Sequence, residues 1–300
     1  MKSKIIRFSV GIAVLVLLLY HVGFNEIISL LEMVDYGYVL IAFLLFIISI
    51  ILAAVNLRMM IRPLKMIPLR HFIDYYLVTR VSSLFLPGRL GEFSMVYFLK
   101  REKINIGKGT AAIIMDKFIT LLCSTIIGTI GVLILFKKQI SLLILLAAGA
   151  VILSVIIIIG EKVINKYLQK KFASVVTDFS ETLRNYRKKY QREILANGLL
   201  TLGRFGIIAF SAHYMFLALH IDVSSIWILL IGGIEVLTTV VPITINGLGI
   251  KQSVGVYMYS IVGVTAEITA ARYIIGLIIQ YGFGLLSLVF IRRVHHETTH

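Results

Sequence analysis

The sequence predicts an all-α integral membrane protein, with about six full transmembrane helices and two broken re-entrant hairpins arranged as an inverted repeat. Of its 300 residues, 59% are hydrophobic and 15% are charged, which leaves too little polar surface to cover a soluble protein of this size. Apolar stretches of bilayer-spanning length recur along the chain, and two are interrupted by a proline with nearby glycines. We expect one polytopic membrane domain over residues 1–300 and no soluble domain.

The first half, residues 1–160, contains four predicted full spans at residues 8–22, 37–55, 111–135 and 141–160. Basic residues precede the first span and follow the second, whereas the loop at residues 23–36 has three acids and no Lys or Arg. By the positive-inside rule, the N-terminus is cytoplasmic and this loop lies outside. No small-residue cleavage site follows the first span, so we expect it to be retained rather than removed as a signal peptide.

A polar segment at residues 161–193 separates the two halves. It holds nine Lys and Arg against four acids, and its apolar residues recur at spacings of three and four. This pattern predicts a basic amphipathic helix on the cytoplasmic side, either continuous or broken into two. Two placements stay open: the helix lies along the anionic inner leaflet, or it is a solvated linker between the halves.

The second half, residues 194–293, contains predicted full spans at residues 194–219 and 270–291, followed by a short polar tail at 294–300. Residues 226–241 and 250–264 flank a second break and have no basic residues at their outer ends, so this hairpin enters from outside. The last span ends at Arg292 and Arg293. We therefore expect both termini to be cytoplasmic in a multi-pass protein of the cell membrane.

The first break interrupts the apolar pattern of residues 72–98. It contains Pro87, Gly88, Arg89, Gly91 and Glu92. Both flanks are basic and each half is too short to cross the bilayer, so a hairpin from the cytoplasmic side fits best. Irregular, charged backbone at membrane depth requires a covering of protein or a water-filled cavity.

The second break has the same character. It contains Pro242, Asn246, Gly247, Gly249 and Lys251. After each break a half-helix begins inside the membrane, where its free N–H groups carry partial positive charge. Arg89 and Lys251 lie beside these two helix starts, and such a place suits a phosphate or another anionic headgroup. We expect them to hold the headgroup near the midplane while the two halves rock around it.

Several polar residues within the predicted membrane region are candidates for substrate binding. They are Arg89, Glu92, Lys251 and Asn246, with Arg204, Glu235, Asp116, Arg80 and Lys117 as weaker candidates. A charge within the bilayer is costly and needs a partner. Arg89 and Glu92 could therefore form a purely structural ion pair, and Glu92 could instead titrate and couple transport to protons. His213 is expected to be a core histidine.

The segment His296-Glu297-Thr298-Thr299-His300 matches the spacing of a zinc-protease motif. It lies outside the predicted helices and has no third ligand after it, so we expect no metal site. Neither a glycine-rich phosphate loop nor a nucleophile elbow is present, so we expect no catalytic residues and no cofactor. The net charge of +15 is spread over short loops beside apolar spans, which favours lipid headgroups over nucleic acid.

Three motifs resemble the flippase-like membrane family typified by the transmembrane region of lysylphosphatidylglycerol synthase. They are residues 86–92 with Lys100 and Arg101, then Met115-Asp116-Lys117, and residues 242–249. The resemblance implies lipid translocation across the cytoplasmic membrane, in some members of aminoacylated phosphatidylglycerol. The aminoacyl-transferase domain is missing, so this chain should not synthesise the lipid. In the family a base and then Glu follow the last glycine, whereas here Lys251 is followed by Gln252.

We therefore expect a lipid flippase that moves an anionic or aminoacylated phospholipid, or a polyprenyl-phosphate-linked lipid. One alternative is a membrane enzyme acting on a lipid-linked phosphate or sugar, with Glu92, Asp116 or Glu235 as acid or base. Another is a non-catalytic partner subunit of a separate lipid synthase or glycosyltransferase, attached through the basic helix.

Overall fold

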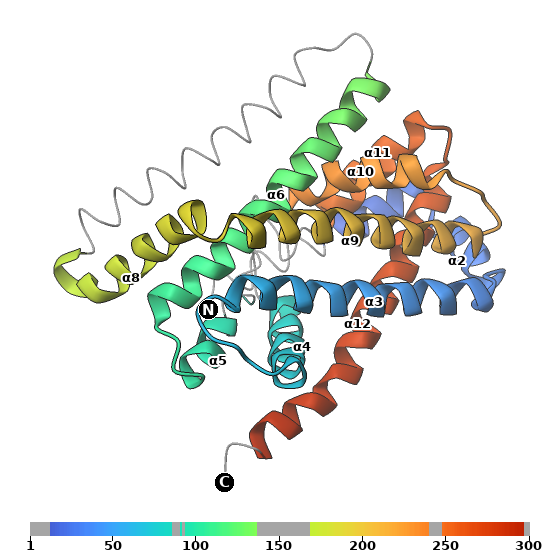
Figure 1. The fold of residues 1–300 in the computed structure, drawn as a ribbon. Helices are drawn as coiled ribbons and strands as arrows, with labels where there is room; N and C mark the ends of the chain where they lie inside the picture. Colours follow the sequence, from blue (N-terminus) through green and yellow to red (C-terminus); the bar gives the residue numbers. More distant parts are fainter. Residues whose placement is uncertain (1–12, 86–90, 92–93, 137–168, 240–247, 297–300) are drawn as a thin grey trace.

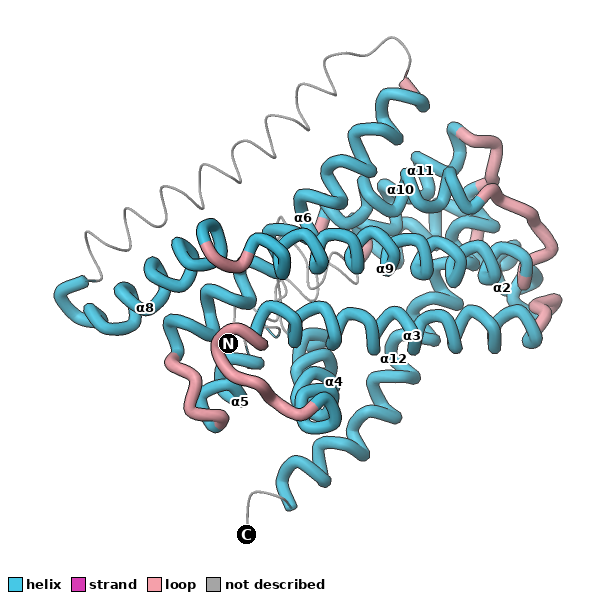
Figure 2. The backbone as a smooth tube through the Cα atoms, viewed as in Figure 1, coloured by secondary structure: helices cyan, strands magenta, loops and turns pink. Residues whose placement is uncertain are grey.

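The computed structural model describes residues 13–85, 91, 94–136, 169–239 and 248–296. The regular structure of these residues is helical throughout, as Figure 2 shows. The helices are Ala13–Val22, α2 (Phe24–Glu32), α3 (Tyr36–Ile61), α4 (Leu69–Phe85), α5 (Met95–Arg101), α6 (Ile106–Leu135), α8 (Gln169–Lys188), α9 (Gln191–Leu217), α10 (Ser225–Thr238), α11 (Ile250–Ile261) and α12 (Ala266–His296).

Four of the described helices are long and apolar enough to cross a membrane: α3, α6, α9 and the Ala266–Ser287 part of α12. They confirm the helices predicted at residues 37–55, 111–135, 194–219 and 270–291. The predicted span at 141–160 lies outside the described residues. The first predicted span is described only from Ala13, and its helix bends by 83° into α2, so the two together account for a fifth span at most.

The prediction of a loop at residues 23–36 was wrong, because α2 occupies most of it. The side chains of Ile27, Leu30 and Leu31 share one face of this helix and pack in a cluster with residues of α12. Ile27 is 1% exposed. A short amphipathic helix therefore covers this end of α12, and its acidic residues occupy the other face.

Helices α3 and α9 lie side by side along most of their length (Figure 1). Buried hydrogen bonds join them: Asn56 Nδ2 donates to Thr201 Oγ1 at 2.6 Å, and Ser211 Oγ donates to the Ala42 carbonyl at 2.8 Å. Since lipid provides no hydrophobic force between membrane helices, such polar contacts and close packing carry much of their association. This pair connects the first half of the chain to the second.

Helix α6 crosses α10 at a contact made of small residues. A Cβ on Gly233 would lie 2.6 Å from the Gly128 nitrogen and 3.0 Å from the Ser124 carbonyl oxygen. One turn along α6, a Cβ on Gly131 would lie 3.1 Å from the Leu230 Cβ. The two backbones touch here because neither Gly128 nor Gly233 has a side chain.

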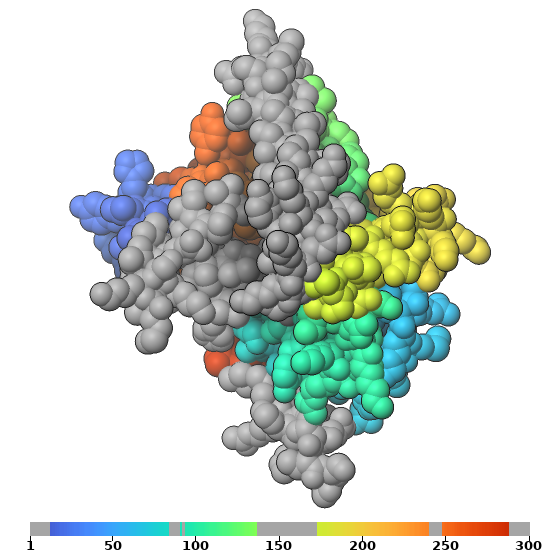
Figure 3. Space-filling view, turned by 90° about the vertical axis from the view of Figure 1, so that its left-hand side faces the viewer, coloured from blue at the N-terminus to red at the C-terminus, as the bar shows by residue number. Residues whose placement is uncertain are grey.

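The predicted amphipathic helix is present as α8, and a break at Lys189 and Tyr190 separates it from α9. Val176, Thr182 and Tyr186 of α8 are buried. It lies directly against the first turns of α6 (Figure 3), where Gly107 leaves space for its backbone. Tyr186 also donates a hydrogen bond to the Met60 carbonyl of α3. Protein therefore covers part of its apolar face, and its placement against the inner leaflet stays a prediction.

At each predicted break one helix ends and another begins. Helix α4 ends before the first break and α5 begins after it, and α10 and α11 flank the second break in the same way. The tip residues Pro87, Gly88, Arg89, Glu92, Pro242, Asn246 and Gly247 lie outside the described part of the chain. Gly91 is buried against the backbone of Ser83. Gly249 opens α11 with a φ of 84°, a conformation that glycine adopts without a steric penalty.

Candidate functional site

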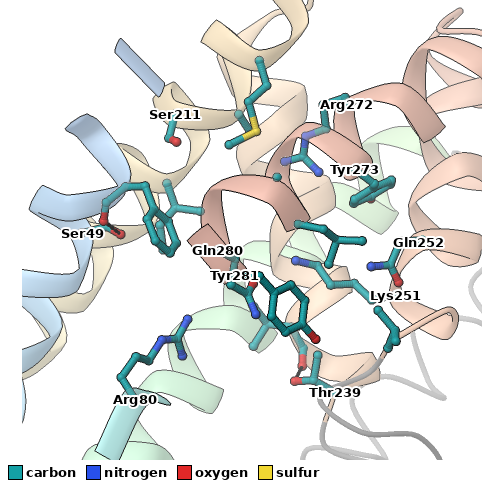
Figure 4. Close-up of a pocket in the computed structure, with 18 residues that line it drawn as sticks. Ser49, Arg80, Ser211, Thr239, Lys251, Gln252, Arg272, Tyr273, Gln280 and Tyr281 are labelled. Carbon is teal, nitrogen blue, oxygen red and sulfur yellow. Dashed lines mark hydrogen bonds between the residues drawn. The ribbon is translucent and has the colours of Figure 1, made fainter. Parts of the chain in front are cut away.

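A cavity lies between α3, α4, α6, α9, α10, α11 and α12. It consists of two adjoining hollows of about 200 and 250 Å³, which share Arg80, Lys251, Arg272 and Gln280 among their lining residues. Figure 4 shows Arg80 of α4 and Lys251 of α11 reaching into it from different sides, with Arg272 of α12 above them. The cavity thus draws its polar side chains from both halves of the chain.

The charge of this cavity is strongly positive. Its described lining contains five cationic side chains, Arg80, Lys117, Arg204, Lys251 and Arg272. The same lining contains one carboxylate, that of Glu235. Charged side chains are rare at membrane depth and mark substrate or ion pathways there, so this cavity is the candidate binding site.

Glu235 is held by two neighbours. It is 3% exposed, and the Lys251 Nζ lies 3.2 Å from its Oε2. The hydroxyl of Tyr273 donates a hydrogen bond to its Oε1. Gly255 of α11 makes this possible, because a Cβ there would collide with the Tyr273 hydroxyl. Helices α10, α11 and α12 therefore meet at this carboxylate.

Two arginines of the lining keep unused hydrogen-bond donors. The Nε atoms of Arg204 and Arg272 are buried and have no hydrogen-bond partner among the residues that the structure describes. The same is true of the Tyr259 hydroxyl. The Arg272 guanidinium lies 4.7 Å from the centroid of the Tyr273 ring and 5.7 Å from that of Phe216. These rings hold the guanidinium in place by cation–π contact, and the guanidinium also donates a side-chain hydrogen bond to the Tyr273 hydroxyl. Its Nε keeps its donor unused. An anion with several oxygen atoms could satisfy these groups.

Asp116 takes part in a separate buried network. It is 3% exposed, and its Oδ1 accepts a 3.0 Å hydrogen bond from Asn197 Nδ2. The same Nδ2 donates to the Asn56 carbonyl at 3.1 Å, so the network ties α3, α6 and α9 together. Lys117 Nζ lies 3.3 Å from Asp116 Oδ2. Asp116 is absent from the cavity lining, and it acts there only as the counter-charge of Lys117.

The structure brings Lys251 together with four of the five weaker candidates, namely Arg80, Lys117, Arg204 and Glu235. Arg89, Glu92 and Asn246 lie outside the described residues. Sequence reasoning missed Arg272, Tyr273 and Gln280. A signal was available, because Arg272 and Gln280 lie eight residues apart in an apolar span and so share one face of a helix. The predicted core histidine, His213, donates a 2.8 Å hydrogen bond from Nδ1 to the Val223 carbonyl and is not part of the lining.

Comparison with known proteins places these features in a family context. A family described as "Lysylphosphatidylglycerol synthase TM region" matches residues 4–287. This match includes all the lining residues of the cavity and both predicted breaks. No curated protein matches the chain.

Proposed function

Because the chain belongs to the family of the lysylphosphatidylglycerol synthase TM region, we propose that it moves a phosphate-bearing membrane lipid between leaflets, with the headgroup in the cationic cavity. The family links the chain to a membrane lipid, and the protein is a multi-pass membrane protein. The observation that carries the proposal is a cavity among apolar helices with five cations and one carboxylate in its described lining.

The barrier to lipid translocation is the charged headgroup. A phosphate loses its hydration in hydrocarbon, and the desolvation of an ion costs several kcal/mol or more. Arg80, Arg204 and Arg272 can replace the lost water contacts with charge-assisted hydrogen bonds. The lipid chains need no such help, because the outer faces of the long helices expose apolar side chains such as Leu44, Ile126 and Leu199.

Helix α11 gives the cavity a second anion-binding element. It begins at Ile250 directly after the second break, and its first turn carries Lys251. The positive end of the helix and the Lys251 ammonium therefore act in the same region. In our proposal, Arg89 plays the corresponding part at the first break, and movement of the helices around the cavity exposes the headgroup to each leaflet in turn.

The enzyme alternative receives less support from the described residues. Glu235 is engaged by Lys251 and Tyr273, and Asp116 is engaged by Asn197 and Lys117. A general acid or base must reach the substrate proton directly or through one water, and both carboxylates are occupied by protein groups. We therefore propose a transporter without synthase activity of its own, in the membrane of the cell.

The test is lipid movement in proteoliposomes. Phosphatidic acid and phosphatidylglycerol with a fluorescent acyl chain are placed in both leaflets, and dithionite quenches the outer label. The wild-type protein should allow nearly complete quenching, and Arg272→Gln should slow it about tenfold or more, since a lost charged hydrogen bond is worth about 1.5–3 kcal/mol. Arg62→Gln, at an exposed arginine outside the cavity, should leave the rate unchanged.

Two outcomes would contradict the proposal. The first is quenching at the rate of protein-free liposomes by wild-type protein that is correctly folded. The second is chemical conversion of the lipid in detergent, where no second leaflet exists, which mass spectrometry of the extracted lipid would detect. The second outcome would establish the enzyme alternative.

A further inference from the structure

We infer that the cavity selects a headgroup that ends in a phosphate monoester or a diphosphate, and that it rejects an aminoacylated headgroup. This inference rests on the proposed function and names its substrate class. It excludes lysylphosphatidylglycerol, the lipid in the family's name, as the preferred substrate of this chain. That lipid carries one phosphodiester anion and two ammonium groups at neutral pH.

The charges inside the cavity do not balance. Lys251 and Glu235 neutralise each other at 3.2 Å, and Lys117 is paired with Asp116 at 3.3 Å. Arg80, Arg204 and Arg272 remain. None of them forms an ion pair among the described residues, and Glu235, already paired with Lys251, is the one carboxylate that acts on Arg272 at longer range. A phosphodiester supplies a single negative charge to three arginines. A phosphate monoester or diphosphate supplies more, and it therefore gains more from the same site.

The hydrogen-bond donors left free in the cavity also favour a terminal phosphate. The cavity cations that form no ion pair with another described residue are all arginines, whose planar guanidinium binds phosphate through two parallel hydrogen bonds. The Nε atoms of Arg204 and Arg272 and the hydroxyl of Tyr259 are buried and unpartnered. A terminal phosphate presents three oxygen atoms that are free of ester bonds, whereas a phosphodiester presents two. The donor set therefore matches the terminal group better.

The cavity also disfavours an aminoacylated headgroup. A lysyl ester would bring ammonium groups into a cavity that already has excess positive charge, and like charges at close range cost several kcal/mol. The one carboxylate of the described lining, Glu235, already binds Lys251 and Tyr273. An ammonium group would find no free counter-ion among these residues. Such unfavourable contacts are a common source of specificity.

The decisive experiment is a binding titration with the full chain in detergent, in which calorimetry measures the heat of binding. The probes are dioctanoyl phosphatidic acid, farnesyl phosphate and farnesyl diphosphate, compared with dioctanoyl phosphatidylglycerol, phosphatidylcholine and lysylphosphatidylglycerol. We expect the terminal-phosphate lipids to bind about tenfold or more tightly than phosphatidylglycerol, and lysylphosphatidylglycerol to bind more weakly still. The tighter of phosphatidic acid and the farnesyl lipids identifies the lipid chain as glycerol-based or isoprenoid.

Variants test the role of the arginines. Arg272→Gln and Arg204→Gln should each reduce the advantage of phosphatidic acid over phosphatidylglycerol, and Arg272→Lys should recover only part of it because lysine lacks the planar fork. Arg62→Gln is the matched control outside the cavity. Size-exclusion chromatography establishes whether each variant is folded. If Arg272→Gln does not fold, Arg204→Gln provides the test.

The outcomes separate this inference from the proposed function. Equal or tighter binding of lysylphosphatidylglycerol overturns the inference, even where the protein transports lipids. Selective binding of terminal phosphates without movement in proteoliposomes overturns the transporter proposal and leaves the selectivity standing. Selectivity that is unchanged in both arginine variants shows that the cavity is not the binding site.

Discussion

At the scale of single residues, Glu235 has two opposing effects. Its carboxylate stabilises the fold by binding Lys251 and Tyr273. The same negative charge lies in the cavity lining and repels an incoming phosphate. Removal of this charge should therefore change folding stability and phosphate binding in opposite directions.

The first prediction concerns Glu235→Gln. The variant should unfold more easily by about 1–3 kcal/mol, since Lys251 loses its charged partner, and it should bind phosphatidic acid more tightly than the wild type. Thermal unfolding in detergent and calorimetric titration measure the two effects. Glu181→Gln makes the same chemical change on the exposed surface of α8 and should alter neither. Weaker phosphate binding by Glu235→Gln would show that Glu235 helps to bind the headgroup.

Glu102 gives a prediction of pH dependence outside the membrane helices. The Lys65 Nζ lies 2.9 Å from its Oε2, and the Tyr75 hydroxyl donates to Oε1 at 3.1 Å. The hydrogen bond from Lys65 is the main reason why the pKa of Glu102 lies below its ordinary value of 4.5. A lowered pKa in the folded state means that the ionised carboxylate stabilises the fold above pH 4.5, and that this stabilisation is lost as the pH falls through the folded pKa.

The second prediction compares the wild type with Glu102→Gln across pH. At pH 7 the wild type should be more stable, by less than about 1 kcal/mol because the pair is partly exposed. Below pH 4.5 the difference should shrink toward zero. Melting temperatures at pH 7, 5 and 3.5 measure it. A difference that persists at the lowest pH would mean that the side chain acts through packing and not through its charge.

Charges that stand in an apolar context could be picked out from the sequence, and their role in binding stays a prediction. Arg204, Glu235 and Lys251 were predicted in this way, and they line the cavity. Arg272 was missed because it lies near the start of a long apolar span, where an arginine also fits a position at the membrane surface. Which of these charges meet depends on how the helices pack, and spacing along one chain does not contain that information.

At the scale of helices, the crossing of α6 and α10 depends on glycine. A Cβ on Gly233 would lie 2.6 Å from the Gly128 nitrogen, which is closer than a carbon can approach. The neighbouring Gly232 has nothing within 4 Å of its Cβ position. The two adjacent glycines of α10 thus differ in what they tolerate.

The third prediction uses this pair of glycines. Gly233→Ala should destabilise the protein by about 1–3 kcal/mol, since the added methyl group forces the two helices apart. Gly232→Ala should be neutral or stabilising by up to about 1 kcal/mol, because alanine favours the helix. Thermal unfolding of the two variants in the same detergent provides the comparison. Equal stabilities would mean that the helices can separate at this point without cost.

The helix assignments succeeded for long apolar stretches and failed for α2. The loop prediction at residues 23–36 relied on acidic residues and the absence of Lys and Arg, which report the side of the membrane. It overlooked Ile27, Leu30 and Leu31, whose spacing of three and four is helical. Charge determines where a segment lies relative to the membrane, whereas apolar spacing determines its conformation.

At the scale of the whole molecule, the orientation in the membrane stays a prediction. The charge pattern places the connection between α9 and α10 outside and α8 inside. Helix α9, one of the four membrane-crossing candidates, lies between these two segments. A single label on each side of α9 therefore tests both the crossing and its direction.

The fourth prediction uses the single cysteine of the chain. Cys123 is buried, so Cys123→Ala provides a background for new cysteines. Asp222→Cys, at a side chain that is 80% exposed, should react with a membrane-impermeant maleimide in intact cells. Lys188→Cys should react only after permeabilisation. The reverse pattern would invert the orientation, and labelling of both from the same side would show that α9 does not cross.

The inverted repeat also stays a prediction. Each half has a broken element, with α4 and α5 in the first and α10 and α11 in the second. Their symmetry depends on the tips and on residues 141–160, which lie outside the described part of the chain. A sequence reveals a repeat only when the two copies keep similar residues, whereas here the first tip has an arginine and a glutamate and the second has a lysine.

The contact between α6 and α10 limits how the two halves can move. Helix α6 belongs to the first half of the chain and α10 to the second, and their backbones touch at Gly128 and Gly233. Helices α3 and α9 join the halves again along most of their length. The two halves can rotate relative to each other about these helix contacts. They cannot separate without breaking both the α6–α10 and the α3–α9 contact. We therefore expect that any movement opening the cavity keeps both of these helix contacts intact.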